Sequence, residues 1–352
     1  MASSRASATV CYDGCGWTLP YLIGVTEHLQ RERASTLASL DLRYAGVSSG
    51  ACVALAAALE VPMPELMSEL LQWAPTCRRK PWTSAAAVED ICRRIVKDDA
   101  SVEALERSGR FAVGVSRLEL PGRGGEAHSR KLALHALHSS ACDGATASSL
   151  FESVVRSSFG GDKERLVSFL VASCSVPGLT SPADVPLLNG KYLDGALSAR
   201  FFRLPWRTDA TVRLSAFPGR TDADVACRVS TPLLRCFAPP GEAELLRLHE
   251  LGLEDGPEVV RLLLSKTSRA RVAHAEADDD DRSHEPRTRL EQRMHVVRGR
   301  RVLLPGAGHE VITGSAATPC ARGVARHCRH AAPRQQRGNV SRGRGVPVLR
   351  PW

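Results

Sequence analysis

The sequence predicts an α/β fold with a mostly parallel central sheet, and two observations near its start predict it. A short β-prone run, Ala8–Tyr12, ends at the turn Asp13–Gly16, and a helical pattern follows over Pro20–Gln30. A second strand, Leu42–Val47, then breaks into an Ala-rich helix over residues 51–60. Because strands that alternate with helices pair in parallel through crossover connections, this order indicates a parallel sheet.

The later elements continue this alternation up to about residue 268. Helices are expected at residues 63–73, 87–96, 102–107, 132–137, 148–157 and 163–173, and strands at Phe111–Leu120 and Val212–Phe217. Ala243–Leu264 is expected to be helical with a break at its glycines, 252–256. From Arg269 the periodicity is lost, and the rest is expected to be a disordered basic tail.

The positive charge of the chain is concentrated in that tail. The whole chain of 352 residues carries a formal charge of +9, and residues 271–352 supply +8 of it from 16 Arg and 8 acids. The main part is therefore nearly neutral, which excludes a basic nucleic-acid-binding domain there, so we expect no nucleic-acid partner. For the tail, a membrane-attracting arm and translation of a GC-rich region in a wrong frame both stay open.

The distribution of apolar residues and cysteines indicates an intracellular protein. No run reaches the roughly 18–20 apolar residues that a spanning helix needs, and the start has no apolar signal-peptide core. The 11 cysteines are odd in number and irregularly spaced, which indicates free thiols in a reducing compartment. We therefore expect a cytoplasmic location.

The pentapeptide from Gly46 to Gly50 has the form G-x-S-x-G and makes Ser48 a candidate nucleophile. A nucleophilic serine stands on a strained strand-to-helix turn, and glycines two residues to either side remove Cβ atoms that would collide there. The expected strand before Ser48 and helix after it supply this context. An ordinary Gly/Ser turn is the alternative.

Ser48 needs a base within hydrogen-bond reach, and the sequence offers two candidates. His249 lies in an amphipathic helix, where a surface or packing role is the simpler interpretation. Asp194, followed by Gly195 and Ala196, lies in a turn that permits close approach, although Asp-Gly is also frequent in plain turns. The carboxylate of Asp194 is thus the preferred base, if it is held tightly in a partly desolvated site.

Gly14, Cys15 and Gly16 follow the first strand and precede a helix, so their backbone N–H groups are candidates for an oxyanion hole. A dinucleotide-binding turn is the competing interpretation, but it needs a glycine where Leu19 stands. We find no P-loop and no metal-ligand cluster, and we expect neither a cofactor nor a metal.

Taken together, these motifs resemble the patatin-like phospholipase family, within it the subgroup of adiponutrin and adipose triglyceride lipase. The order matches: DGCGW at residues 13–17, GVSSG at 46–50 and DGA at 194–196. Further similar stretches are Phe111–Leu120, ASCSVPG at 172–178, residues 212–219 and parts of 236–255, so the resemblance covers residues 8–266. Leu19 departs from the family pattern, which has a third glycine there.

The resemblance implies a three-layer α/β/α sandwich and a Ser–Asp dyad of Ser48 and Asp194, with Gly14, Cys15 and Gly16 as the oxyanion hole. It implies a hydrolase domain over residues 8–205, a strand and helical extension over 206–268 packed on it, and the tail over 269–352. The expected activity is hydrolysis of glycerolipid acyl esters, as a triacylglycerol lipase or a phospholipase A. A catalytically weak lipid-binding or droplet-associated regulatory protein is the alternative, motivated by Leu19.

Lipid esters lie in membrane or lipid-droplet surfaces, so we expect a peripheral protein with a docking patch. Trp73, Arg78, Arg79, Lys80 and Trp82 combine aromatic and basic side chains within ten positions. The competing interpretation is a solvated helix end whose Trp packs inward. A protein co-activator is left open.

Overall fold

The computed structural model describes residues 5–118, 151–183, 188–189, 192–198 and 201–283. The chain divides into two units, residues 1–285 and 286–352, and only the first contains described residues. The helix expected at 132–137 and residues 284–352 of the expected tail lie outside them.

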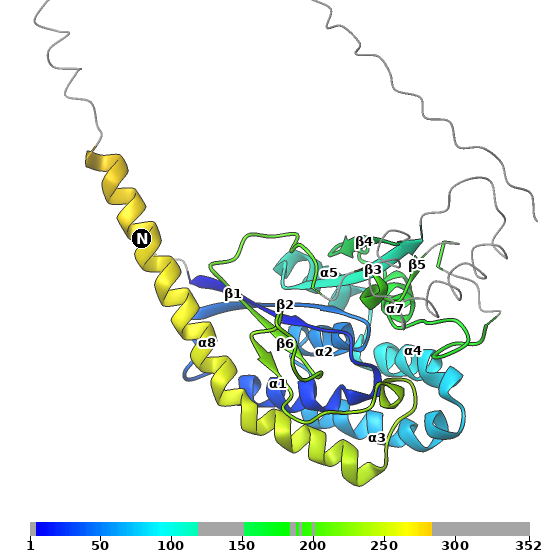
Figure 1. The fold of residues 1–352 in the computed structure, drawn as a ribbon. Helices are drawn as coiled ribbons and strands as arrows, with labels where there is room; N and C mark the ends of the chain where they lie inside the picture. Colours follow the sequence, from blue (N-terminus) through cyan, green and yellow to red (C-terminus); the bar gives the residue numbers. More distant parts are fainter. Residues whose placement is uncertain (1–4, 119–150, 184–187, 190–191, 199–200, 284–352) are drawn as a thin grey trace, which may run out of the picture. The chain divides into compact units, whose positions relative to one another are not determined.

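A mixed, mostly parallel sheet of seven strands forms the centre of the first unit (Figure 1). Its order is β4-β3-β2-β1-β6-β7, with β5 paired to β3, and only β4 and β5 run antiparallel to their neighbour. The strands are β1 (Ala6–Tyr12), β2 (Leu40–Val47), β3 (Phe111–Leu118), β4 (Phe151–Arg156), β5 (Tyr192–Leu193), β6 (Ala210–Ser215) and β7 (Val225–Ala226).

The chain leaves β1 for β2 on one side and later returns to the other side of β1 with β6. This makes β1 a topological switch point, and in open α/β sheets a crevice for ligands forms at the carboxyl ends of the strands there.

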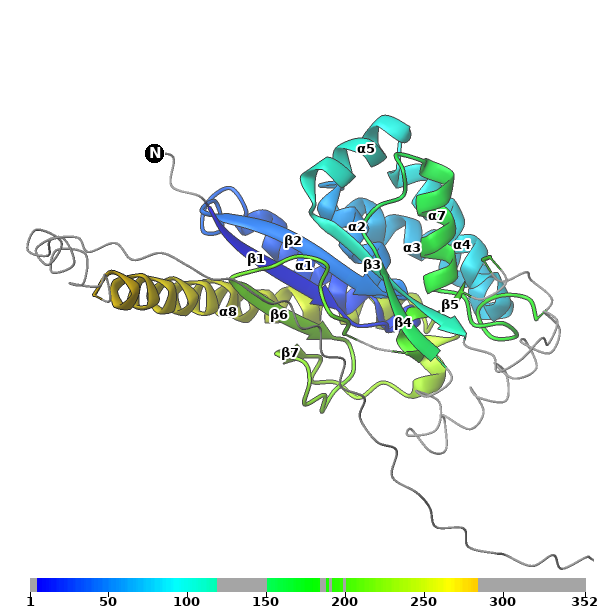
Figure 2. The ribbon, with the colours of Figure 1, turned by 90° about the horizontal axis from the view of Figure 1, so that it is seen from above.

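Helices lie on both sides of the sheet, as expected (Figures 1 and 2). The main core, under β1 and β2, is built largely from apolar residues of these strands, α1, α2 and α3. On the opposite face a smaller cluster, Cys11, Ala45 and Ala112, is covered by Phe201, Phe202, Leu204 and Trp206. The helices are α1 (Pro20–Glu32), α2 (Ser49–Ala58), α3 (Met63–Arg79), α4 (Ser84–Ile95), α5 (Asp99–Ser108), α7 (Lys163–Ser173) and α8 (Glu242–Ser283).

The long helix α8 lies along α1, and glycines on both helices permit the contact (Figure 1). A Cβ at Gly24 would collide with the carbonyl of His249, and one at Gly252 with the carbonyl of Tyr21. Polar bonds fix the same interface: the Tyr21 hydroxyl donates to Asp255 at 2.8 Å. The two backbones thus approach more closely than larger residues would allow.

The structure corrects the helix that was expected at residues 148–157. Phe151–Arg156 forms β4, antiparallel to β3, with residue 151 opposite 118. The run is short and rich in β-branched and aromatic residues, so its apolar pattern fits a strand as well as a helix, and the free edge of β3 decides between them.

Two expectations for α8 were also wrong. The helix passes through residues 252–256 without the expected break, because the glycines there lie against α1 and the packing outweighs their low helix propensity. It also continues to Ser283, so residues 269–283, assigned to the disordered tail, are helical. Ala and Arg, both good helix formers, are frequent in this stretch. No helix among the described residues is long and apolar enough to span a membrane.

Candidate active site

Ser48 lies between β2 and α2, on a strained turn. Its φ of 51° and ψ of −138° place it in a region that L-residues seldom adopt. A Cβ at Gly46 would lie 2.5 Å from the Gly50 carbonyl oxygen, and a Cβ at Gly50 would collide with the carbonyl of Asp13. Both glycines of the pentapeptide are therefore needed for strand, turn and helix to approach each other.

Ser48 and Asp194, far apart in sequence, meet at this turn. The Ser48 hydroxyl donates to Asp194 Oδ2 at 2.8 Å, and the two residues are only 7% and 6% exposed. The second carboxylate oxygen, Oδ1, accepts the Ala196 N–H at 2.9 Å. Gly195 lies directly against the Gly114 carbonyl, where a Cβ would collide. The backbone thus aims one oxygen of Asp194 at Ser48.

Ser173, at the end of α7, supports the backbone of the turn at Ser48. Its hydroxyl accepts the Ser48 N–H at 2.8 Å and donates to the Gly114 carbonyl at 2.7 Å. The sequence did not identify this role, because a serine at the end of a helix has no signal that separates it from its neighbours. Ser173 connects the turn of Ser48 to β3.

The loop of Gly14, Cys15 and Gly16 lies beside Ser48. A Cβ at Gly14 would lie 2.8 Å from Ser48 Cβ, so the N–H groups of this loop are near the position where an ester oxygen would sit. Gly16 has a φ of 53° and lies against the Cys236 carbonyl. Within the described residues, the N–H groups of Gly14 and Gly16 have no hydrogen-bond acceptor.

The third N–H group of this loop is already occupied. Cys15 donates its N–H to Ser49 Oγ at 3.2 Å, and its thiol lies 3.3 Å from the same oxygen. Burial raises the pKa of the Cys15 thiol far above its ordinary value, so the thiol stays neutral and does not compete with Ser48. No pattern in the sequence singles out Ser49, which stands between Ser48 and the last glycine of the motif.

An apolar cavity of about 70 Å³ opens at Ser48. Its apolar lining includes Leu19, Leu66, Leu70, Ala87, Val88 and Ile91. Leu19, the departure from the family pattern, contributes its side chain to this lining, and α1 begins directly after it with Pro20 at its first position. An acyl chain is the ligand whose chemistry fits such a lining.

The histidines of the described residues lie elsewhere. His249 Nε2 is 2.9 Å from Glu27 Oε2 between α1 and α8, which agrees with a packing role. His28 packs against Gly256, and His274 lies 4.0 Å from Asp209. Among the described residues, the side chain that accepts from the Ser48 hydroxyl is therefore a carboxylate, and no imidazole lies beside it.

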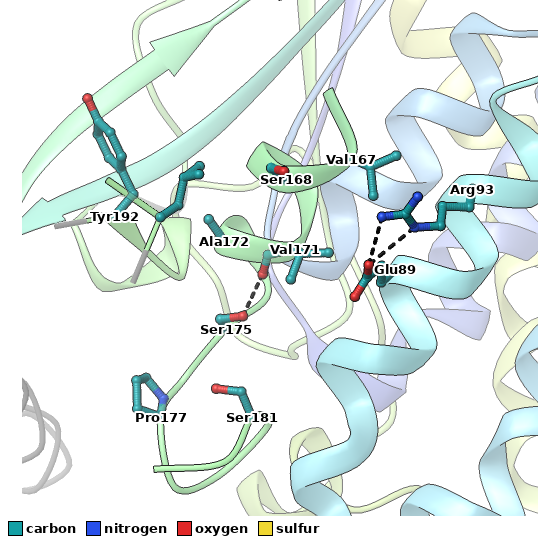
Figure 3. A pocket seen from close by; sticks show the side chains of 11 residues that line it. Glu89, Arg93, Val167, Ser168, Val171, Ala172, Ser175, Pro177, Ser181 and Tyr192 are labelled. Carbon is teal, nitrogen blue, oxygen red and sulfur yellow. Dashed lines mark hydrogen bonds and ion pairs between the residues drawn. The ribbon is translucent and has the colours of Figure 1, made fainter. Parts of the chain in front are cut away.

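A second, larger cavity of about 200 Å³ lies between α4, α7 and the segment that follows α7 (Figure 3). Among the described residues that line it, the one cation is Arg93, which binds Glu164 and Glu89, and Ser175 donates to the Val171 carbonyl. Figure 3 shows the contacts of Arg93 with Glu89 and of Ser175 with Val171. Neither Ser48 nor Asp194 lines it, so we place the chemistry in the smaller cavity.

Comparison with known protein families agrees with this geometry. The sequence model of the family described as patatin-like phospholipase matches residues 10–203, more than half of the chain. The matched span contains Ser48, Asp194 and the loop of Gly14–Gly16. A comparison with curated proteins found no match.

Proposed function

Because the chain belongs to the patatin-like phospholipase family, whose members are lipid acyl hydrolases, we propose that it hydrolyses glycerolipid esters with a Ser48–Asp194 dyad. The observation that carries the proposal is the 2.8 Å hydrogen bond from the Ser48 hydroxyl to Asp194 at the end of an apolar cavity. The fixed orientation of Asp194 supports its role as base, because a weak base acts only from a well-defined position.

The reaction proceeds in two steps, acylation of Ser48 and hydrolysis of the acyl-enzyme. Ser48 Oγ attacks the ester carbonyl while its proton passes to Asp194 Oδ2, and the carbonyl oxygen becomes an oxyanion facing the N–H groups of Gly14 and Gly16. As the C–O bond breaks, the leaving alcohol takes the proton from Asp194. A water molecule then attacks the acyl-enzyme, giving a proton to Asp194 that returns to Ser48 as the fatty acid leaves.

The lining of the cavity supports the proposed substrate class. Its apolar walls favour an acyl chain, and triacylglycerols and phospholipids both present one. The motifs shared with the adipose triglyceride lipase subgroup favour a triacylglycerol, in which case a lipid droplet would be the surface from which the protein takes its substrate.

The primary test is a panel of lipid classes and a soluble p-nitrophenyl ester, assayed with wild type, Ser48→Ala and Asp194→Asn. Both variants are expected to lose turnover while circular dichroism stays native. Ser168→Ala is the matched control, because its hydroxyl donates to the Glu164 carbonyl on the exposed side of α7. Turnover retained by the Ser48 variant would refute the proposal.

A catalytically weak lipid-binding protein is the second candidate, and one observation favours it. One of the three N–H groups expected to stabilise the oxyanion is bound to Ser49. A fluorophosphonate probe separates the candidates: labelling that is lost in Ser48→Ala supports the enzyme, whereas an unlabelled wild type supports the binding protein.

A further inference from the structure

Two large apolar side chains project into solvent beside the cavity of Ser48. Trp82, in the short 3₁₀ helix η2 (Pro81–Thr83), is 47% exposed and Leu179 is 39% exposed. They are two of the four exposed large apolar residues in the described part of the chain, and the other two lie on α8. Exposed apolar groups that lie together mark a surface for a partner more often than scattered ones do.

Backbone bonds bring these two residues to the same place. The Ala85 N–H donates to the Thr180 carbonyl at 2.8 Å and so joins the start of α4 to the loop of Leu179. Thr180 and Ser84 both line the cavity that contains Ser48. Trp82 and Leu179 therefore border the cavity from two segments.

Hydrogen bonds hold the exposed position of Trp82. The Trp17 indole donates to Ser84 Oγ at 3.0 Å, and Ser84 donates to the Pro81 carbonyl at 2.7 Å. Thr83 donates to the Lys80 carbonyl at 2.7 Å. The outward indole is thus a fixed feature of η2, and Trp17, which joins it to the oxyanion loop, lines the same cavity.

The basic residues beside η2 divide into those bound to the protein and those that are not. Arg78 donates to the carbonyls of Pro239 and Pro240, and the Trp73 indole donates to Asp90 at 3.0 Å. Arg79 and Lys80 are exposed and, within the described residues, form no ion pair. The expected docking patch therefore loses Trp73 and Arg78, which serve the fold, and gains Leu179.

We propose that Arg79, Lys80, Trp82 and Leu179, the η2 surface, dock on an anionic phospholipid surface. Trp82 and Leu179 enter the boundary between headgroups and acyl chains, while Arg79 and Lys80 face the lipid phosphates. The inference rests on the proposed function, because an ester that reaches Ser48 has to leave such a surface. Docking by η2 places the cavity of Ser48 next to the lipid.

The test measures sedimentation with phosphatidylcholine vesicles, with and without phosphatidylserine, using the full chain carrying Ser48→Ala. Trp82→Ala with Leu179→Ala is expected to weaken binding to the anionic vesicles by roughly tenfold or more. Arg79→Glu with Lys80→Glu is expected to weaken it by at least roughly fivefold for each cation lost. Added salt should weaken the wild-type binding as well.

The far half of α8 offers a matched control. Arg269, Arg271 and Val272 are exposed, and they lie near Asp209 at the start of β6, whereas Ser48 lies at the opposite end of the strands. Arg269→Glu with Arg271→Glu, and separately Val272→Ala, should leave vesicle binding unchanged. Binding of the η2 variants at the wild-type level, or an equal loss in the controls, would overturn the proposal.

A second readout separates this inference from the proposed function. This readout uses η2 variants that keep Ser48. The ratio of their rate on vesicle lipid to their rate on a soluble short-chain ester is expected to fall below that of wild type. An unchanged ratio argues against docking by η2. If wild type hydrolyses neither ester, the proposed function fails, while the vesicle measurement still decides the docking.

Discussion

Among the described residues, several buried hydroxyls donate to a carboxylate, and the pairs of Ser48 and Tyr21 differ in their surroundings. Ser48 donates to Asp194 and Tyr21 donates to Asp255, each at 2.8 Å, and glycines at both places allow close approach of backbones. Asp255 also pairs with Arg228, and the pair is enclosed where α1 meets α8. Ser48 lines the apolar cavity, whereas neither Tyr21 nor Asp255 does.

Access to a cavity, not the hydrogen bond, therefore separates the proposed catalytic pair from the pair of Tyr21 and Asp255. The pKa of Tyr21 is raised far above its ordinary value, by burial first and by Asp255 next, so its hydroxyl keeps its proton. Ser48 has in addition a strained backbone, an apolar cavity and a neighbouring loop in which the N–H groups of Gly14 and Gly16 have no acceptor among the described residues.

Exchange of each carboxylate for an amide should have the largest effect and should affect activity at one pair and stability at the other. Asp194→Asn removes the base and is expected to lower kcat on a soluble ester by about 10⁴-fold. Asp255→Asn is expected to lower the free energy of unfolding by about 1–3 kcal/mol and leave kcat near wild type. Ester kinetics and urea unfolding measure the two effects. A folded Asp255 variant without activity would contradict the distinction.

The helix interface gives the next largest effect. In Gly252→Ala the new Cβ collides with the Tyr21 carbonyl, and the variant is expected to lose about 1–3 kcal/mol of the free energy of unfolding. Gly241→Ala is the control, because a Cβ there meets nothing within 4 Å. Urea unfolding curves for both decide the point, and equal stability of the two variants would show that α8 does not need the close contact.

Substitution of Ser173 tests how far the position of Ser48 depends on the hydrogen bond from its N–H to the Ser173 hydroxyl. Ser173→Ala removes the acceptor of the Ser48 N–H, and we expect kcat to fall about tenfold with KM little changed. Ser173→Thr keeps a hydroxyl and should restore most of the rate. If the threonine variant is as slow as the alanine variant, the hydrogen bond is not what positions Ser48.

The smallest expected effect concerns Ser49. Ser49→Ala frees the Cys15 N–H for the oxyanion and is expected to raise kcat by roughly threefold, within the net value of one hydrogen bond. Pre-steady-state release of p-nitrophenol reports the acylation step directly. A slower burst would instead mean that Ser49 holds the loop in its working position.

The sequence predicted the parts of the site that depend on local geometry. Gly46, Ser48 and Gly50 were identified because only a tight strand-to-helix turn needs that spacing, and Asp194 because no histidine had a suitable setting. Ser173 and Ser49 escaped notice, since their partners are set by how β3, α7 and the Gly14–Gly16 loop meet in three dimensions.

The same limit explains the errors in the fold. The apolar pattern of residues 148–157 does not distinguish strand from helix, and the open edge of β3 made the choice. Glycines 252 and 256 interrupt a helix only when nothing packs on them, and the sequence does not say that α1 does.

Cys236 lies outside the matched residues 10–203, yet its carbonyl lies against Gly16 and it lines the cavity of Ser48. Helix α8 also lies outside the matched residues. It packs on α1, which begins at Pro20, shortly after the loop of Gly14–Gly16. The stretch matched by the family model is therefore shorter than the compact unit of residues 1–285. Truncation at residue 205 would uncover the apolar side of α1 and remove the residue that lies against Gly16. The part of the chain that packs as one unit therefore extends beyond the part that the family model matches.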